Sequence, residues 1–487
     1  MKRLLATGVT CVALLSGVLL VRTARYGQDQ LAVEPASMIS IPSGAAERLA
    51  AAVRLQTISH EDPDAFRADA FEALHEQLRA AFPQVHATLK RETVSAHSLL
   101  YTWVGSDTSL KPILLAGHLD VVPVEAGTEE QWQEDPFGGR IADGFIWGRG
   151  AIDNKSAVVG MLEAVELLLH EGFTPKRTVY LAFGHDEEVG GTQGAREIAN
   201  LLKRRGVALQ MVLDEGGVIS ERILSGVDEP VAMVGIAEKG FVSVELTTRG
   251  AGGHSSLPPP QSSIGVLSAA IARLESKPMP ARLDGPTRQL LDRIGPGFPF
   301  ARRVGLANLW LSRPLVLRGL ERSSTTNAMA RTTTAVTIFQ AGTKDNVLAS
   351  QARAVVNFRI VPGDSIAGVL AHVRRVVADE RVEVKIAGRF SAEPSSISST
   401  DSDAFRALER AIRRVASDVI VAPYLVIVAT DSRYYGDLSA GIFRFLPLRL
   451  TQEDLARMHG SNERVAIRHY EDAIRVYRQL MIDAAGT

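Results

Sequence analysis

The chain has 487 residues, of which 46% are hydrophobic and 22% are charged, so its composition is that of a globular protein with two or three domains. Its 54 basic and 55 acidic residues leave a formal net charge of −1. This balance excludes the overall basic field that holds nucleic acid, so no nucleic-acid partner is expected. The only cysteine is Cys11, near the N-terminus, so a metal ion in the body of the protein must be held by His, Asp and Glu.

The N-terminal segment predicts a membrane anchor or a secretory signal. Lys2 and Arg3 precede an uncharged, mostly apolar run over residues 4–21. As a helix, the 18 residues of this run rise about 27 Å, close to the hydrocarbon core of a bilayer at about 30 Å. Arg22 and Arg25 lie where a cleavage site needs small residues, which favours an uncleaved anchor with the body outside the cytoplasm. The alternative is a cleaved signal and a secreted or periplasmic protein.

After a polar linker, apolar runs alternate with helical patterns. Three short aliphatic runs over 112–117, 178–184 and 209–213 are typical of strands buried on both faces of a sheet. Between the first two lies a helical pattern over 154–172, in which apolar residues recur at helical spacing and Gly172 marks the end. Strand, helix and strand in this order predict a doubly wound α/β core.

A second, smaller α+β domain is expected inside the first. The runs 241–250, 332–342 and 352–360 alternate like half-exposed strands, and a helical pattern lies over 262–276. The Pro-, Arg- and Leu-rich segment 278–322 has no clean period, and its role stays open. The predicted organisation is an anchor or signal (1–25), a linker (26–43), the first part of the main domain (44–237), an inserted domain (238–393) and the second part of the main domain (394–487).

Each of the three predicted buried strands is followed by side chains that can bind a metal ion. In an open parallel sheet the carboxyl ends of neighbouring strands line one edge, and ligands bind there. Taken singly, each such residue is more often a turn or surface residue, but together they predict one site suited to zinc. The side chains are His118 and Asp120 after the first strand, Glu187 and Glu188 after the second, Asp214 or Glu215 after the third, Asp153 just before a helix, and His459 in a glycine-containing turn.

In the order and spacing of its motifs, the chain resembles the dinuclear zinc peptidases related to aminoacylase and bacterial glutamate carboxypeptidase. The resemblance is closest to the carboxypeptidase S branch, which includes secreted N-acyl amino acid hydrolases. It implies a doubly wound α/β catalytic domain with an inserted α+β lid or dimerisation domain. It covers about residues 45–480 and rests on the stretches GHLDVVPV, GRGAIDNKS, GHDEEVGG, LDEGG, GGHSS, NFRIVPG and HGSNER.

The resemblance also implies a ligand set for two zinc ions, with cobalt or manganese as possible substitutes. Asp153 would bridge the ions. His118 and Asp214 would complete the shell of one ion, and Glu188 and His459 that of the other. The peptide bond after the bridging aspartate would be cis. Glu215 competes with Asp214 from the neighbouring position, and Asp214 is preferred because this branch shows LDEGG with the aspartate as ligand.

Two carboxylates near the ligands would take other roles. Asp120 would hold the imidazole of His118 in the correct tautomer and orientation. Glu187, outside the metal shell, would act as general base on a metal-bound water and pass the proton to the leaving amine. The reaction implied is the cleavage of a peptide or N-acyl amide bond next to a free carboxylate.

The inserted domain would supply the substrate contacts. His254 would reach a neighbouring active site across a homodimer and stabilise the oxyanion. Arg359, with Asn346 beside it, would bind the substrate carboxylate, because a guanidinium fork suits that group. Substrates would be small peptides or N-acyl amino acids. The close alternative is a hydrolase or synthase of fatty N-acyl amino acids, and a non-catalytic scaffold is less favoured because no ligand or base is missing.

Overall fold

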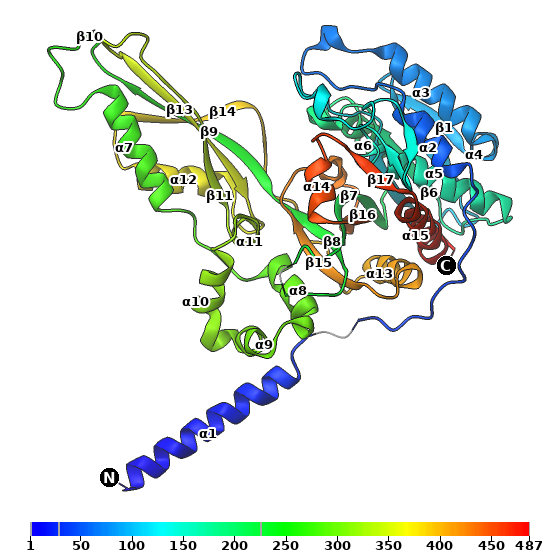
Figure 1. Cartoon of the computed structure of the whole chain (residues 1–487), viewed down its shortest axis with the longest axis horizontal. Helices are drawn as coiled ribbons and strands as arrows, with labels where there is room; N and C mark the ends of the chain where they lie inside the picture. Colours follow the sequence, from blue (N-terminus) through cyan, green and yellow to red (C-terminus); the bar gives the residue numbers. More distant parts are fainter. Residues whose placement is uncertain (1, 28–29, 225, 487) are drawn as a thin grey trace.

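The computed structural model describes residues 2–27, 30–224 and 226–486. Figure 1 shows a main domain built on one large sheet, a lid domain that projects away from it on a smaller sheet, and a long N-terminal helix that protrudes from the body. This helix, α1 (Lys2–Ala24), is the one candidate membrane span among the described residues, by length and composition.

The main domain is organised around an eight-stranded mixed sheet. Its centre has the predicted parallel strands, since β3 pairs in parallel with both β6 and β7. The sheet is not parallel throughout, because β2 runs antiparallel to β6, and β1 runs antiparallel to β2. In spatial order the strands are β1 (Lys90–Val94), β2 (Ser98–Trp103), β6 (Val179–Gly184), β3 (Ile113–His118), β7 (Met211–Ser220), β16 (Ile442–Leu450), β8 (Val231–Glu238) and β15 (Ile420–Val426).

Helices cover both faces of this sheet, as a doubly wound fold requires. Successive residues of β3 point to opposite faces: Ile113 and Leu115 join the larger hydrophobic core, and Leu114 and Ala116 join a smaller one. The larger core is covered by α2 (Ala45–Val53), α3 (Ala68–Ala81), α4 (Pro83–Thr88), α5 (Lys155–His170), α13 (Asp403–Val415) and α15 (Ile467–Ala485), and the smaller one by α6 (Ala195–Arg204).

Short elements complete the main domain near the carboxyl ends of the central strands. They form a three-stranded sheet and several single turns of helix. The members are β4 (Arg140–Ala142), β5 (Phe145–Trp147), β17 (Arg464–Ala466), α14 (Gln452–Arg457), and the 3-10 turns η1 (Pro63–Ala65), η2 (Glu129–Gln131), η3 (Glu187–Val189) and η5 (Asp431–Tyr435).

The lid domain is a four-stranded antiparallel sheet with two helices on one face (Figure 1). It has its own hydrophobic core, which includes Val244, Leu267, Phe358 and Val373. A two-stranded ribbon forms its tip. The sheet order is β11 (Thr333–Ala341), β13 (Gln351–Ile360), β9 (Gly240–Arg249) and β14 (Val382–Ala392), the helices are α7 (Ser263–Ser276) and α12 (Ile366–Val377), and the ribbon pairs β10 (Gly253–His254) with β12 (Val347–Leu348).

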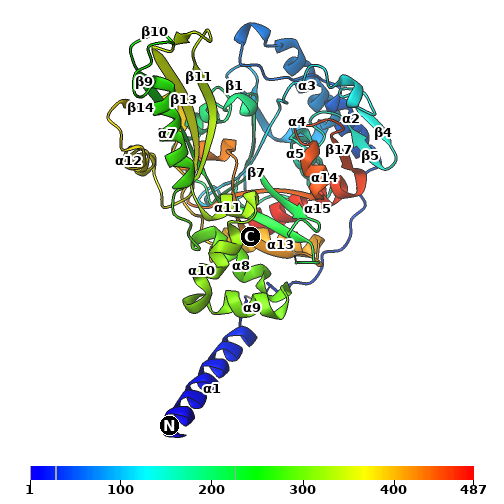
Figure 2. The ribbon, with the colours of Figure 1, turned by 60° about the vertical axis from the view of Figure 1, so that its left-hand side comes forward.

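The segment whose role the sequence left open folds into helices beneath the two domains (Figures 1 and 2). The first helix packs on the main domain, because Leu290, Leu291 and Ile294 join the larger core. Part of the predicted inserted domain, 238–393, therefore belongs to the main domain by packing. The elements are α8 (Gly285–Ile294), η4 (Gly295–Gly297), α9 (Phe300–Ala307), α10 (Leu309–Leu320) and α11 (Ser324–Ala330).

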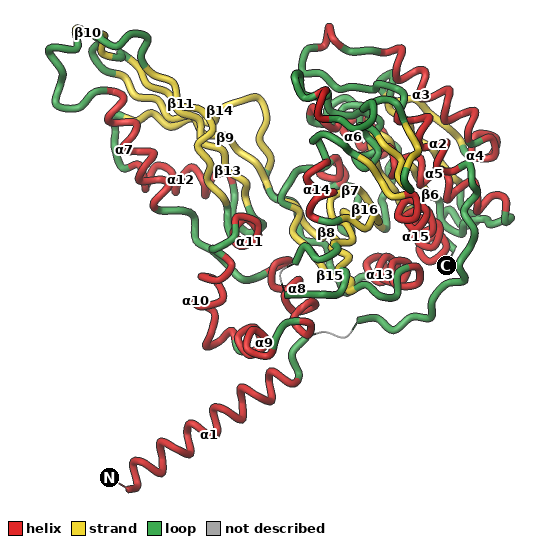
Figure 3. Tube along the Cα trace, viewed as in Figure 1, coloured by secondary structure: helices red, strands yellow, loops and turns green. Residues whose placement is uncertain are grey.

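Figure 3 shows loops where the chain crosses between the two domains. At the crossing, the chain leaves β8 after Glu238, and Ser395 on the returning segment donates its N–H to the carbonyl of Glu238 at 3.1 Å. The buried Lys239 amine donates to the carbonyls of Ala328 and Arg331. These bonds tie the lid, the helical segment and the main domain together at one point.

Candidate metal centre and active site

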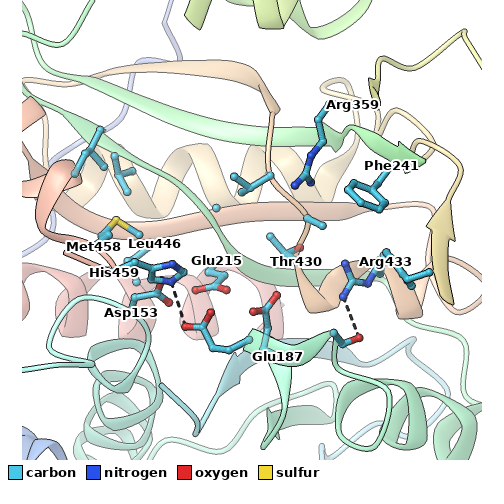
Figure 4. A pocket seen from close by; sticks show the side chains of 18 residues that line it. Asp153, Glu187, Glu215, Phe241, Arg359, Thr430, Arg433, Leu446, Met458 and His459 are labelled. Atoms are coloured by element: carbon cyan, nitrogen blue, oxygen red, sulfur yellow. Dashed lines mark hydrogen bonds and ion pairs between the residues drawn. The ribbon is translucent and has the colours of Figure 1, made fainter. Parts of the chain in front are cut away.

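The ends of three central strands bring the predicted ligands together. His118 is the last residue of β3, and Glu187 and Glu188 begin the 3-10 turn η3 directly after β6. Parallel strands end at the same edge of a sheet, so these side chains converge there. Figure 4 shows Asp153, Glu187 and His459 facing one cavity, although His459 comes from the C-terminal part of the chain.

Asp153 lies at the centre of this group. One of its carboxylate oxygens, Oδ1, is 3.0 Å from Nε2 of His118, and the other, Oδ2, is 3.1 Å from Nε2 of His459. Each oxygen thus faces a different imidazole, which is the arrangement of a carboxylate shared between two cations. The peptide bond between Asp153 and Asn154 is cis, as predicted.

A further carboxylate accompanies each histidine. Glu188 Oε1 is 3.3 Å from Nε2 of His459, and Glu215 Oε1 is 3.4 Å from Nε2 of His118. Two groups of three residues could each hold a metal ion, because the ligand atoms within each group all lie within 4.8 Å of one another. One group is His118, Asp153 and Glu188, and the other is His118, Glu187 and Glu215. This donor set of imidazole and carboxylate groups suits a bound metal cation.

Glu215, rather than Asp214, is the residue beside His118. Neighbouring residues of a strand point to opposite faces, so only one of this pair on β7 can face the cavity. Glu215 lines the cavity, and its Oε2 accepts a hydrogen bond from Nδ2 of Asn154 at 2.5 Å. Asp214 is buried on the other side, in the field of Arg444. The preferred residue of the sequence prediction, Asp214, thus faces away from the cavity, and its alternative Glu215 faces into it.

The electrostatics of the site suit a cation. Burial raises the pKa of Glu188 and raises that of Glu215 to about 8, because each carboxylate loses water without gaining a full cationic partner. Within the described residues, Oε1 of Glu188 is buried and makes no hydrogen bond. Asp153, which accepts a hydrogen bond from His459, and the neighbouring carboxylate of Glu188 raise the pKa of His459 to about 10. A bound cation would offset the crowding of negative charge.

Asp120 orients both the histidine and the glutamates. Its Oδ1 lies 3.3 Å from Nδ1 of His118, which also faces the Asp120 carbonyl at 3.0 Å. Its carboxylate accepts the backbone N–H groups of Glu187 at 3.2 Å and Glu188 at 3.1 Å, and the hydroxyl of Ser59. One buried carboxylate thus fixes the His118 ring and the turn that carries both glutamates.

Glu187 lines the cavity beside the ligand group (Figure 4). Burial, followed by the negative charges of Asp431 and Glu215, raises its pKa well above the usual range. Asp431 lies in η5 after strand β15 and is itself buried, with no hydrogen bond to either carboxylate oxygen from the described residues. A glutamate with a raised pKa next to a metal site has the properties of a proton carrier.

Glu463 supports the loop that carries Asp153. Its carboxylate accepts the backbone N–H groups of Gly150, Ile152 and Asp153 at 3.1, 2.8 and 3.1 Å, and it pairs with Arg149 at 2.6 Å. Both members of this ion pair are buried. Glu463 belongs to the motif HGSNER, and its position four residues after His459 was a usable signal for this role, which we did not predict.

The cavity has a volume of about 590 Å³ and a cationic end. Arg359 enters it from the lid strand β13 with its guanidinium 4.8 Å from the ring centroid of Phe241, and Arg433 enters from η5 of the main domain (Figure 4). Burial, followed by the positive charge of Arg433, lowers the pKa of Arg359. We did not predict Arg433, although the polar run TDSR, which begins four positions after the end of the apolar strand β15, resembles the other three strand ends.

The opposite end of the cavity is apolar. Met458 and Leu446 lie next to His459 in Figure 4. The candidate ligands Asp153 and Glu215 lie between them and the two arginines. Val218, Val428 and Leu455 also line this cavity. A ligand with a carboxylate at one end and an apolar group at the other matches this division.

Two predicted residues lie elsewhere. His254 and Asn346 are exposed at the tip of the lid, where the N–H of Ser255 donates to the carbonyl of Asn346 at 3.1 Å. This tip is at the opposite end of β13 from Arg359, so Asn346 is not beside Arg359 as expected. Neither residue lines the cavity of its own chain.

Known proteins similar to this chain agree with the geometry. The model of peptidase family M20/M25/M40 matches residues 114–483. Probable carboxypeptidase S-like 2 of Dictyostelium discoideum is 42% identical over 484 residues, which are 96% of this chain and 92% of that protein. The human N-fatty-acyl-amino acid synthase/hydrolase PM20D1 is 39% identical over 466 residues, 94% of this chain and 92% of that protein. The M20 family metallo-carboxypeptidase Sso-CP2 from Sulfolobus solfataricus has a similar fold, with a TM-score of 0.63 at 18% identity over 90% of this chain and 98% of that one.

The replacement Glu463→Ala should lower the free energy of unfolding by about 3–5 kcal/mol, because it leaves the buried Arg149 without its anion. Denaturant unfolding measures this change. In the control, Glu171→Ala, the lost partner is the more exposed Arg478, and the cost should stay below about 1 kcal/mol. Equal costs for both variants would contradict the supporting role of Glu463.

Proposed function

This chain belongs to the peptidase family M20/M25/M40, and from that membership and the geometry of its site we propose that it hydrolyses an amide bond next to a free carboxylate with the help of two bound metal ions. The observation that carries the proposal is the Asp153 carboxylate between two histidines. We assign the ions, with zinc as the favoured metal, to five ligands: His118, Asp153, Glu188, Glu215 and His459.

Metal ions in such a site lower the pKa of a water molecule and polarise a carbonyl group. The protein's own contribution is proton transfer. Glu187 lines the cavity beside the assigned ligands without belonging to them, so it would take a proton from the attacking water and pass it to the leaving amine. Asp120 keeps the turn that carries Glu187 in place throughout.

The two ends of the cavity orient the substrate. The carboxylate binds at Arg359 and Arg433, since two guanidinium groups offer charge and several N–H donors. The scissile amide would then lie beside the assigned metal ligands, and the acyl group would extend toward Met458 and Leu446. Arg359 belongs to the lid, so closure of the lid over the substrate would complete the site.

The apolar end favours N-acyl amino acids with long acyl chains over small peptides. A buried methylene group contributes about 0.8 kcal/mol, so an apolar cavity wall rewards each added carbon. The similarity to a protein named N-fatty-acyl-amino acid synthase/hydrolase supports this choice. The second candidate is hydrolysis of small peptides. It is supported by the similarity to a protein named carboxypeptidase S of Saccharomyces cerevisiae, which is 30% identical over 90% of this chain.

Exposed residues suggest a homodimer and a membrane location. His254 lies at the lid tip, outside its own cavity, so it would serve the active site of a second copy. Helix α1 is almost wholly exposed and apolar over residues 4–21, which supports an anchor that holds the body outside the cytoplasm.

Glu187→Gln should reduce kcat about 100- to 10,000-fold while both metal ions stay bound, because the amide keeps the shape of the base without its proton affinity. Hydrolysis assays with N-acyl amino acids, combined with metal analysis by mass spectrometry, measure both quantities. Glu197→Gln on α6, outside the cavity, is the matched control and should stay at the wild-type rate. A metal-loaded variant with the wild-type rate would refute the assignment of the base.

The same variant tests the homodimer. Glu187→Gln and His254→Ala chains, each inactive alone, should recover about a quarter of the wild-type activity when mixed and allowed to exchange, because half of the dimers then contain one complete site. No recovery after proven exchange would mean that His254 does not act across a dimer.

Glu215→Ala should weaken zinc binding by at least about 100-fold, more than the loss of an orienting residue. Asp214→Asn, the matched control at the neighbouring position, should weaken it less than about 10-fold. Competition with a chelator of known affinity measures both values. The opposite ranking would restore Asp214 as the ligand.

Met458→Asn should lower kcat/KM for a long-chain N-acyl amino acid by about 10-fold, which corresponds to about 1.4 kcal/mol of lost apolar contact. The rate for a short acyl group or a dipeptide should change less than about 2-fold. Val104→Asn, at an exposed position outside the cavity, serves as control. An equal loss for long and short substrates would show that the acyl chain does not extend toward Met458.

A further inference from the structure

Helix α10 presents an apolar face to the outside of the protein. Trp310, Leu311 and Leu315 are 58%, 54% and 69% exposed, and Pro314 is exposed between them. Pro314 follows Trp310 by four positions, and Leu315 follows Leu311 by four, so these two adjacent pairs lie one above the other on one face of the helix. The described structure buries no residue of α10 fully. Phe300, at the start of α9, adds a further ring at 58% exposure. A surface helix of a soluble protein turns such a face inward.

This apolar face lies beside the end of α1. The side-chain amide of Asn308, between α9 and α10, donates to the carbonyl of Leu19 at 3.3 Å and contacts the hydroxyl of Thr23 at 3.4 Å. Nε of Arg22 donates to the carbonyl of Ala307 at 3.3 Å. Figure 2 shows α9 directly at the inner end of α1. The corner between α9 and α10 is therefore level with the last turn of the apolar run 4–21.

The depth of the corner between α9 and α10 decides which part of a bilayer it would contact. If the apolar run of α1 fills the hydrocarbon core, Leu19 lies at its boundary, because 18 helical residues rise only about 27 Å. Trp310 is two residues from Asn308 and shares that depth. Tryptophan with aliphatic neighbours is typical of the interface between hydrocarbon and headgroups.

The charge around the corner fits a membrane surface as well. Residues 298–322 contain five arginines and a single acidic residue, Glu321, which pairs with Arg331. Arg313 and Arg318 are exposed, and the ion pairs among the described residues include neither. A helix with an apolar face and flanking arginines binds the interface of a bilayer that contains anionic lipids.

We propose that α9 and α10, residues 300–320, form a docking platform that lies on the same bilayer into which α1 inserts, with Phe300, Trp310, Leu311 and Leu315 in the interface and the arginines at anionic headgroups. The inference rests on the proposed membrane location of α1. The platform gives the body a second contact with the bilayer besides the single helix, and it holds the main domain at a fixed height and orientation.

Quenching of tryptophan fluorescence tests the proposal on the full chain. The protein is reconstituted into vesicles of phosphatidylcholine with or without phosphatidylglycerol, and part of the lipid carries brominated acyl chains. Bromine should quench part of the emission of the wild type, and Trp310→Phe should lose that part. The three other tryptophans, at 103, 132 and 147, belong to the main domain and stay unquenched. Equal quenching in both proteins, or none in either, overturns the proposal.

A matched variant and a second label separate the possible failures. Leu257→Trp in the Trp310→Phe background places the ring at the lid tip, 82% exposed and far from α1 (Figure 1), and should stay unquenched. Cys11, the only thiol, should be protected from a membrane-impermeant maleimide if α1 is inserted. Protected Cys11 with unquenched Trp310 refutes the platform but keeps the anchor, and reactive Cys11 refutes both. Neither result bears on hydrolysis of a soluble substrate, which tests the proposed function separately.

The lipid composition provides a further outcome. The quenched fraction should rise when phosphatidylglycerol is present, and this rise should be lost in the double variant Arg313→Gln, Arg318→Gln. Equal quenching in neutral and anionic vesicles would overturn the role of the arginines. A Trp310 that is shielded from iodide but not quenched by bromine would mean that a second copy of the chain covers the face, and would also overturn the proposal.

Discussion

The carboxylate of Asp153 is the constraint on which the rest of the site depends. It faces two imidazoles that lie 35 positions before it and 306 positions after it in the chain, each at about 3 Å. Such a contact requires the first and last parts of the main domain to fold together, since no local structure brings them close. Glu463 holds the Asp153 loop in place, because it accepts three backbone N–H groups of that loop and pairs with the buried Arg149. Glu463 itself comes from the same turn as His459. The supporting residue and the ligand are thus delivered together.

The crowding of carboxylates at this point has a physical cost and a physical purpose. Glu187, Glu188 and Glu215 meet in one cavity wall, and burial raises the pKa of all three. A bound cation would offset this crowding of negative charge, which is the electrostatic reason to place a metal ion here. The proposed ligand Glu188 and the proposed base Glu187 are close together because they are adjacent in one turn, whose two backbone N–H groups donate to the Asp120 carboxylate.

Much of the fold and of the centre could be predicted from the sequence, because buried parallel strands have a simple pattern and their ends share one edge. The family is confirmed, and so are the strands at 113–118 and 179–184 and the helix at 155–170. Periodicity could not distinguish Asp214 from Glu215, since the choice depends on which face of β7 meets the cavity. It also failed for 278–322, because the outward apolar face of α10 removes the usual contrast between a buried and a solvated side.

The contacts that the lid makes were harder to foresee. Arg359 could be singled out by its motif, but Arg433 reaches the same cavity from a turn 74 positions later in the sequence, and only the folded chain brings the two together. Asn346 shows the reverse case, because a residue close to Arg359 in sequence lies at the other end of a ten-residue strand. Because a strand rises about 3.3 Å per residue, the two ends of a ten-residue strand are too far apart to contact the same ligand.

The two guanidinium groups at the cationic end belong to different domains, and each raises the electrostatic energy of the other when nothing negative lies between them. A carboxylate that binds both removes this repulsion and acts as a bridge. Binding of an anionic ligand would thereby favour the arrangement in which the two domains lie close together. By reciprocity, any change that favours this arrangement would raise the affinity for the ligand. A molecule that lacks the anion leaves the repulsion between Arg359 and Arg433 in place, so it binds less tightly than one that carries it.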